Sequence, residues 1–328
     1  MIELQDDRLH ISFPNVHPVA RCSIGFQRTL RIPDDNREHY LPPGLGNFPL
    51  RHADDHAARL PAAWQKRGGV FLPMYQAEAM WIQFDSIYPF AIKVAAGKIN
   101  AVTGNAWTNA LTTSPQDYLI LPDQPWLDGF SIGKGQIRQF VAMPLGQGYT
   151  TEEQLTGTAE HGGLQILAIP MRREVFELER LQQQRKARES HALSGLSCCE
   201  SMGLAPGGLM RQEIYKDRYG IDAWDTSALL RCFVSIVNST QYLAITGNPP
   251  PAASPTAKQY SDAGLPWFDY YAADLRALEG AEKLAGLDSV ATKGIKNGKT
   301  PLAENEPVLL SNVKKLLPLP YEVREGLF

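Results

Sequence analysis

Residues Trp126–Met143 read WLDGFSIGKGQIRQFVAM, and this stretch decides the fold class. Two apolar runs, Trp126–Ile132 and Gln136–Met143, flank the short connection GKG. A glycine-rich connection of this length between two strand-like runs is typical of a β-hairpin, whose strands lie antiparallel. A parallel pair would need a crossover of about a dozen residues or more, which this connection cannot provide.

Further strand-like runs precede this hairpin, and the connections between them are short. Four such runs fill residues 70–103, and the tight turn Ala96-Gly97 joins the last two. No helix long enough for a crossover interrupts them, which argues against a doubly wound parallel sheet. We therefore expect residues 1–148 to form a largely antiparallel, β-rich domain.

The remainder of the chain, residues 149–328, has a mixed pattern. Leu164–Met171 and Leu229–Val237 are apolar and predict strands, whereas Trp267–Leu284 predicts a helix that begins after a proline. We expect a mixed domain that packs against the first and shares its core, giving an α+β fold overall. The apolar density falls after Gly286, so residues 286–328 are predicted to be a peripheral or flexible tail.

Composition restricts the class of protein. Apolar residues make up 44% of the 328 residues, which is enough to build a core, and the net charge of −3 gives no basic excess for nucleic acid. The first residues carry no signal-peptide pattern, and no run approaches the roughly 18 apolar residues of a membrane helix. The four cysteines fit reduced thiols. These features predict a soluble cytoplasmic protein that contacts neither nucleic acid nor membrane.

The stretch Ser197–Asp225, SCCESMGLAPGGLMRQEIYKDRYGIDAWD, holds the main candidate site. Gly207 and Gly208 predict a loop whose backbone N–H groups could approach a ligand, with Arg211 and Gln212 beside it. The pattern matches neither GxxxxGK[ST] nor GxGxxG, so no phosphate motif and no cofactor are predicted.

Acidic and aromatic side chains follow directly in the same stretch. Glu213 and Asp217 are four residues apart around Tyr215, as an acid/base pair on one helix face would be. Trp224 could line a small-molecule site. If the segment is a strand instead, Gln212 and Ile214 face opposite to Glu213 and Tyr215. The other alternative is a structured loop that only connects two elements and whose charges pair with each other.

His161 is a second candidate, in the run Ala159–Gly163. A histidine that follows Glu160 and precedes two glycines could present a general base at the start of a strand. Without a nucleophile in a frame such as GxSxG, the alternative is a solvated loop. In the hydrolase hypothesis, His161 would join Glu213, Tyr215 and Asp217 in one cleft.

Two further positions carry ligand-binding chemistry. Arg28 falls on the apolar face of a predicted strand, so it needs a carboxylate partner or an anionic ligand unless it lies at an exposed strand end. His52 and His56 are four apart and would reach one metal ion if both lay on a helix. HExxH is absent, and neighbouring Asp54 and Asp55 are better explained as helix caps, so no metal site is predicted.

Several segments resemble a family of uncharacterised soluble bacterial proteins. The resemblance covers most of the chain and rests on the segments FQRTLRIPDD, LPPGLGNFPLRH, AEHGGLQI, MGLAPGGLMRQEIY and AGLPWFDYY. It implies one integrated unit, and no functional residues carry over because the family has no assigned activity.

Two functions follow from these patterns. The first is a binding or scaffold protein that engages a small molecule or protein partner, or forms a homo-oligomer. The alternative is a hydrolase or transferase that acts on a small, anionic substrate with the acid/base pair of residues 203–219. The absence of a nucleophile, cofactor or metal motif favours the first.

Overall fold

The fold was analysed in a computed structural model of the chain. The structure describes residues 1–35, 37–184, 202–270, 275–300, 302, 305, 306, 308 and 312–316.

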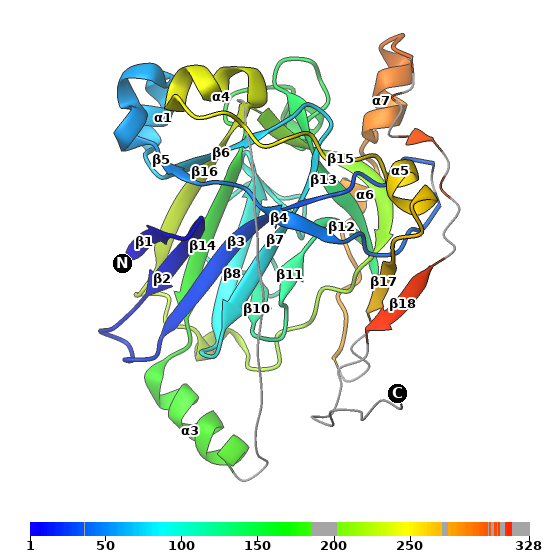
Figure 1. Ribbon diagram of the computed structural model, residues 1–328. Helices are drawn as coiled ribbons and strands as arrows, with labels where there is room; N and C mark the ends of the chain where they lie inside the picture. The colour runs from blue at the N-terminus through cyan, green and yellow to red at the C-terminus, as the bar shows by residue number, and fades with distance from the viewer. Residues whose placement is uncertain are drawn as a thin grey trace, which may run out of the picture.

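One large, mostly antiparallel sheet organises the molecule (Figure 1). Its strands follow the order β1 (Ile2–Gln5), β2 (Arg8–Ser12), β3 (Arg21–Thr29), β7 (Ala79–Ser86), β13 (Gln136–Pro144), β15 (Met202–Arg211), β16 (Leu230–Asn238), β14 (Leu164–Pro170), β8 (Phe90–Ala96) and β10 (Leu119–Leu121). Shorter strands pair beside this path: β4 (Gly44–Asn47), β5 (Arg51–His52), β6 (Val70–Met74), β9 (Ile99–Asn100), β11 (Trp126–Leu127) and β12 (Gly129–Gly133). The described residues are therefore mostly β with a smaller share of helix, as expected for an α+β chain.

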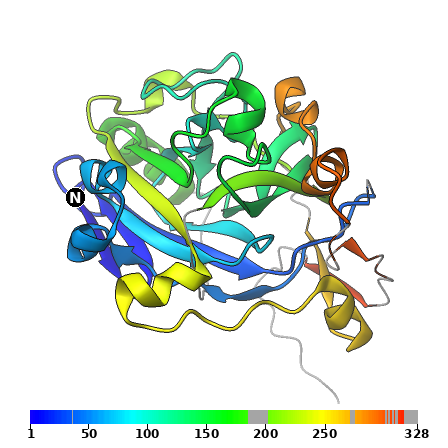
Figure 2. The same cartoon turned by 90° about the horizontal axis from the view of Figure 1, so that it is seen from above.

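Short helices and a small second sheet surround the large one (Figure 2). The helices are α1 (Ala62–Arg67), α2 (Thr151–Thr156), α3 (Arg173–Gln184), α4 (Ser239–Thr246), α5 (Ala257–Asp262), α6 (Glu282–Ala285) and α7 (Val290–Lys296), with 3₁₀ turns at Asp54–Arg59 and Ile221–Ala223. Strand β17 (Trp267–Tyr270) pairs in parallel with β18 (Val313–Leu316). Figure 1 shows α1 and α4 together at one end and α3 projecting at the other. None of the described helices is long and apolar enough to span a membrane.

The predicted hairpin forms, and steric contact with the opposite strand explains why residue 129 is a glycine. Strand β12 pairs antiparallel with β13, opposing Phe130 to Arg138. A Cβ on Gly129 would lie 1.9 Å from the Arg138 carbonyl oxygen, so only glycine allows the two backbones to approach this closely. The first predicted strand is divided: Trp126 and Leu127 form β11, which pairs with β7 instead of β13.

The loop predicted around Gly207 and Gly208 is wrong, because both glycines lie inside strand β15. The β13–β15 register shifts there: Arg138 opposes Leu209, but Phe140 opposes Pro206. Gly207 and Gly208 together oppose the single residue Gln139 and so form a β-bulge, a position that favours small residues in crowded surroundings. A Cβ on Gly208 would lie 2.5 Å from the backbone oxygen of Pro33.

Strands from both sides of residue 148 pair within the same sheet. Strand β13 pairs with β15, β8 with β14, and β6 runs parallel to β16. A division into an N-terminal β-rich part and a mixed C-terminal part is therefore not confirmed, and the boundary near residue 148 stays a prediction. Within residues 286–328 the structure describes α7 and β18.

The helix predicted at Trp267–Leu284 is wrong over most of its described residues, since only its end, from Glu282, lies in a helix, α6. Its first residues form β17, where Phe268 exchanges two backbone hydrogen bonds with Leu41. The Trp267 indole is fully buried and donates to Ser261 Oγ at 2.9 Å. Aromatic residues suit a half-buried strand as well as a helix, so the residue pattern alone did not separate the two.

A buried ion pair lies at the middle of β8. Lys93 is 1% exposed, and its ammonium donates to Asp117 Oδ2 at 2.6 Å and to the carbonyl of Ala110 at 2.5 Å. The Asp117 carboxylate also accepts the backbone N–H of Thr112 at 2.9 Å. A charge at this depth is tolerable only because these partners satisfy it.

We expect Lys93→Ala to lower the free energy of unfolding by roughly 3–5 kcal/mol, because the buried Asp117 carboxylate would lose its counterion. Urea denaturation measures this change. Lys98→Ala is the matched control, since Lys98 is exposed in the adjoining turn and should change stability by less than about 0.5 kcal/mol. Equal effects of the two substitutions would contradict a structural role for the pair.

Candidate functional site

Residues 212–217 leave β15 as an extended segment that two glutamine side chains hold along one edge. Gln124 donates to the Glu213 carbonyl and accepts the Tyr215 N–H, both at 3.2 Å. Gln116 donates to the Tyr215 carbonyl at 3.1 Å and accepts the Asp217 N–H at 2.8 Å. These amides pair with the segment's backbone groups as a neighbouring strand would.

The third glutamine belongs to the segment itself. Gln212 donates to the carbonyl of Trp126 at 3.3 Å and accepts the N–H of Asp128 at 2.9 Å. Gln116, Gln124 and Gln212 are each less than 8% exposed. We call these three side chains the glutamine ladder.

The other edge of the segment pairs with residues 276–278. Leu278 donates its N–H to Ile214 at 2.6 Å, and Lys216 donates its N–H to Arg276 at 2.7 Å. Residues 212–217 are therefore held from both sides and fixed in an extended conformation. The helical spacing assumed for Glu213 and Asp217 does not apply.

Asp217 is bound on both carboxylate oxygens. Oδ2 accepts the hydroxyl of Tyr118 at 2.5 Å and the indole N–H of Trp224 at 2.9 Å, and Oδ1 accepts the backbone N–H groups of Tyr219 and Gly220. Trp224 is fully buried against Tyr118 and presents no surface to a ligand. Burial, together with the bond to Asp217, raises the pKa of the Tyr118 hydroxyl above its ordinary value. This cluster anchors the chain after residue 217.

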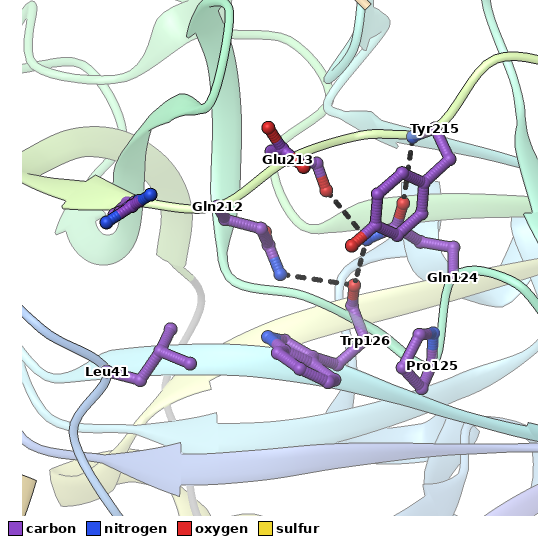
Figure 3. A pocket seen from close by; sticks show the side chains of 8 residues that line it. Leu41, Gln124, Pro125, Trp126, Gln212, Glu213 and Tyr215 are labelled. Carbon is purple, nitrogen blue, oxygen red and sulfur yellow. Dashed lines mark hydrogen bonds between the residues drawn. The ribbon is translucent and has the colours of Figure 1, made fainter. Parts of the chain in front are cut away.

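Four of the predicted site residues, from Arg211 to Glu213 and Tyr215, line a small recess (Figure 3), whereas Gly207 and Gly208 do not. The Trp126 indole and the Tyr215 ring form parts of its wall, and the dashed lines in Figure 3 mark the bonds of Gln124 and Gln212. Arg211 is exposed at the rim and Glu213 is half-buried. The lining residues are Leu41, Gln124, Pro125, Trp126, Arg211, Gln212, Glu213 and Tyr215. The recess volume is about 20 Å³, which admits one water-sized group.

Asp128 is a titratable residue beside this recess that the sequence patterns did not indicate. Its carboxylate accepts the Trp126 indole N–H at 2.6 Å, and its backbone N–H donates to Gln212. Complete burial raises the pKa of the Asp128 carboxyl to about 7, although the indole bond opposes the shift. An aspartate that follows Trp-Leu in a predicted strand gives no signal of such burial.

His161 lies outside the recess and forms a different cluster. Its Nδ1 is 2.7 Å from Glu152 Oε1, and Glu152 Oε2 accepts the backbone N–H groups of His161 and Gly162. The neighbouring carboxylate of Glu160 is more distant, at 4.0 Å. The structure thus places His161 beside Glu152 of α2, and His161 is not among the residues that line the recess with Glu213 and Tyr215.

Arg28 has a carboxylate partner, which is one of the two ways in which a buried arginine was expected to be satisfied. Its Nε donates to Glu78 Oε1 at 3.0 Å, and its Nη2 donates to Ser254 Oγ at 3.1 Å. Arg28 and Glu78 are 9% and 6% exposed. Burial raises the pKa of the Glu78 carboxyl, and the positive charge of Arg28 opposes this shift. Arg28 is therefore not at an exposed strand end.

The two candidate metal ligands do not share a helix. His52 ends β5, whereas His56 lies in the following 3₁₀ turn, where its ring packs edge-to-face with Phe71 at 5.5 Å between ring centroids. Across the described parts of the chain, no three His, Cys, Asp or Glu side chains are grouped to hold a metal ion.

Comparisons of the chain with protein-family models, with curated proteins and with solved structures gave no match.

We expect Gln124→Ala to lower the free energy of unfolding by roughly 2 kcal/mol, because it leaves the Glu213 carbonyl and the Tyr215 N–H without a partner. Thermal or urea denaturation measures the loss. Gln136→Ala, at an exposed position on β13, is the control and should be nearly neutral. A neutral Gln124→Ala would show that the ladder does not hold the segment.

The raised pKa of the Asp128 carboxyl predicts that the stability of the protein depends on pH. Its folded-state pKa of about 7 exceeds the usual carboxyl value, so the folded protein binds a proton that the unfolded chain has released. The free energy of unfolding should therefore fall as pH rises toward 7. Relative to Asp128→Asn, the native chain should lose about 2–3 kcal/mol between pH 5 and pH 8 in urea titrations. Parallel pH profiles of the two proteins would contradict the buried carboxyl.

Proposed function

We propose that the protein is a binding protein that takes one small group of a protein partner into the recess around Trp126. The observation that carries this proposal is the composition of the recess wall. An indole, an exposed arginine and a half-buried carboxylate meet there, in Trp126, Arg211 and Glu213. Tryptophan, tyrosine and arginine are the residue types that dominate binding energy at protein interfaces.

Rigidity of the recess supports the same function. Gln124 and Gln212 fix the backbone of Glu213, Tyr215 and Trp126 before any partner arrives. A preorganised surface loses little conformational freedom on binding, so more of the contact energy appears as affinity. The recess is thus suited to hold a partner's side-chain tip between the indole and the charged rim.

The alternative hydrolase or transferase function has less support from this geometry. Asp217, one member of the proposed acid/base pair, accepts four hydrogen bonds from the chain itself. A space of about 20 Å³ admits a water-sized group and not a substrate with its leaving group. Glu213 therefore lacks both its partner and a substrate cleft.

Quantitative co-purification with single variants tests the proposal. Arg211→Glu reverses the charge at the rim, so we expect it to reduce the recovery of a stoichiometric protein partner by about tenfold or more. Arg180→Glu, on α3, is the charge-matched control and should retain the partner. A partner recovered equally with both variants would exclude the recess, and circular dichroism verifies that both variants fold.

A further inference from the structure

Glu152 and His161 form a pair outside the recess around Trp126, and their hydrogen bonds fix the state of the imidazole ring. Glu152, on α2, is 3% exposed, so its charge needs partners within the fold. Its Oε2 accepts the backbone N–H groups of His161 and Gly162, at 3.2 and 3.0 Å, and its Oε1 lies 2.7 Å from His161 Nδ1. The fold therefore holds the carboxylate against one particular nitrogen of the ring.

This contact determines which ring nitrogen carries the proton. An ionised carboxylate only accepts hydrogen bonds, so His161 Nδ1 must donate to Glu152. In the neutral imidazole the lone pair then lies on Nε2. The His161 side chain is 18% exposed, and no hydrogen bond within the described residues engages its Nε2. The pair thus presents an unprotonated nitrogen in a fixed orientation.

The other histidines that the structure describes lack this combination. Both ring nitrogens of His17 are engaged, Nε2 by a carboxylate of α3 at 3.0 Å and Nδ1 by a backbone N–H at 3.2 Å. His39 pairs its Nε2 with a carboxylate at 2.9 Å, but its Nδ1 is buried away from solvent. No carboxylate contacts the ring nitrogens of the remaining described histidines, which are His10, His52 and His56.

An accessible, unprotonated nitrogen suits His161 to nucleophilic chemistry. Imidazole is one of the side chains that form covalent intermediates in group transfer. Metal binding is not favoured, because no three His, Cys, Asp or Glu side chains in the described part of the chain are grouped to hold an ion. A general base needs a substrate held beside it, and His161 does not line the recess around Trp126. A nucleophile at the surface can instead react with a small electrophile that arrives from solution.

Arg67 makes the electrophile an anionic one. Its Nη1 donates to the carbonyl of His161 at 2.9 Å and its Nη2 to the carbonyl of Glu160 at 3.2 Å, and no described carboxylate pairs with it. A guanidinium has five N–H donors, so others remain for an anion, and phosphate oxygens match their geometry. The Glu160 carboxylate opposes an anion, but it lies on the Nδ1 side at 4.0 Å and is 66% exposed, so solvent screens it.

We propose that His161 accepts a phosphoryl group on Nε2 from a small acyl phosphate. The chain has no nucleotide-binding glycine motif, so the donor must carry its own good leaving group. The Nε2 lone pair attacks phosphorus, and the N–P bond forms as the P–O bond to the acyl group breaks. The released carboxylate takes that electron pair, and no proton has to leave Nε2.

Glu152 is a positioning residue in this step. Positive charge develops on the imidazole as the N–P bond forms, and the carboxylate stabilises it through the Nδ1–H bond. Arg67 offsets the negative charge of the incoming phosphoryl group. Nothing in this proposal depends on the recess around Trp126, so the two sites stand or fall separately.

Incubation of the full chain with acetyl phosphate, followed by intact-mass and peptide mass spectrometry, tests the assignment. We expect the chain to gain the mass of one phosphoryl group, located on His161 and lost on acidification. His161→Asn, whose amide can still donate to Glu152, should stay unmodified. His52→Asn, at an exposed histidine, is the control and should be modified as the native chain is. No incorporation, or incorporation at the other histidines at the same rate, would overturn the proposal.

Glu152→Gln separates positioning from folding. Its amide can donate to Nδ1 and so moves the ring proton to Nε2, and we expect phosphorylation to slow by about tenfold. Heteronuclear NMR of the imidazole nitrogens should show this change of tautomer, and thermal melting establishes that the variant folds. An unchanged tautomer together with an unchanged rate contradicts the role of Glu152.

Arg67→Gln tests the choice of an anionic electrophile. We expect it to slow the reaction with acetyl phosphate by about tenfold, because a charge-assisted contact is lost. The reaction of His161 with uncharged diethyl pyrocarbonate should keep its rate, since it depends on the free Nε2 alone. Equal effects on the two reagents, or no effect on either, contradict the assignment of a phosphoryl group.

Discussion

The pairing of β13 with β15 is the interaction on which the rest of the structure depends. It joins residues 136–144 to residues 202–211 and places the strands before and after it in one sheet. The bulge at Gly207 and Gly208 lets the chain pass close to Pro33 without breaking this ladder. Backbone polar groups must be paired wherever water is excluded. The chain that continues beyond the end of β15 therefore needs hydrogen-bond partners from neighbouring segments.

The glutamine ladder supplies those partners beyond the end of β15. Two of its amides each satisfy one donor and one acceptor of residues 213–217, which is the pairing that a further strand would give. Side chains can do this without adding a strand that would cover the neighbouring surface. The recess around Trp126 therefore stays open at a place where a complete sheet would have closed it.

Local patterns predicted the parts of the fold that local interactions control. The hairpin ending at Met143 follows from two strand-like runs and a glycine connection, and it was found. Strand β15 was missed because its glycines and proline imitate a loop, and only the approach of Pro33 and the register with β13 explain them. Among the predicted site residues that lie outside the recess, Arg28 has Glu78 as its carboxylate partner and His161 has Glu152. Pairings between residues on separate elements depend on how the sheet assembles, and a short sequence motif does not indicate them.

The parallel pairing of β6 with β16 joins Val70 to Val234, which are 164 positions apart (234 − 70). Contacts this distant in sequence form late, since a long stretch of chain must be closed before they are made. During synthesis on the ribosome, the edge of β6 that pairs with β16 therefore stays unpaired until β16 has been synthesised. Unpaired edges are the places where incomplete chains associate with one another. The topology thus concentrates the risk of aggregation in the nascent chain, before its last long strand emerges.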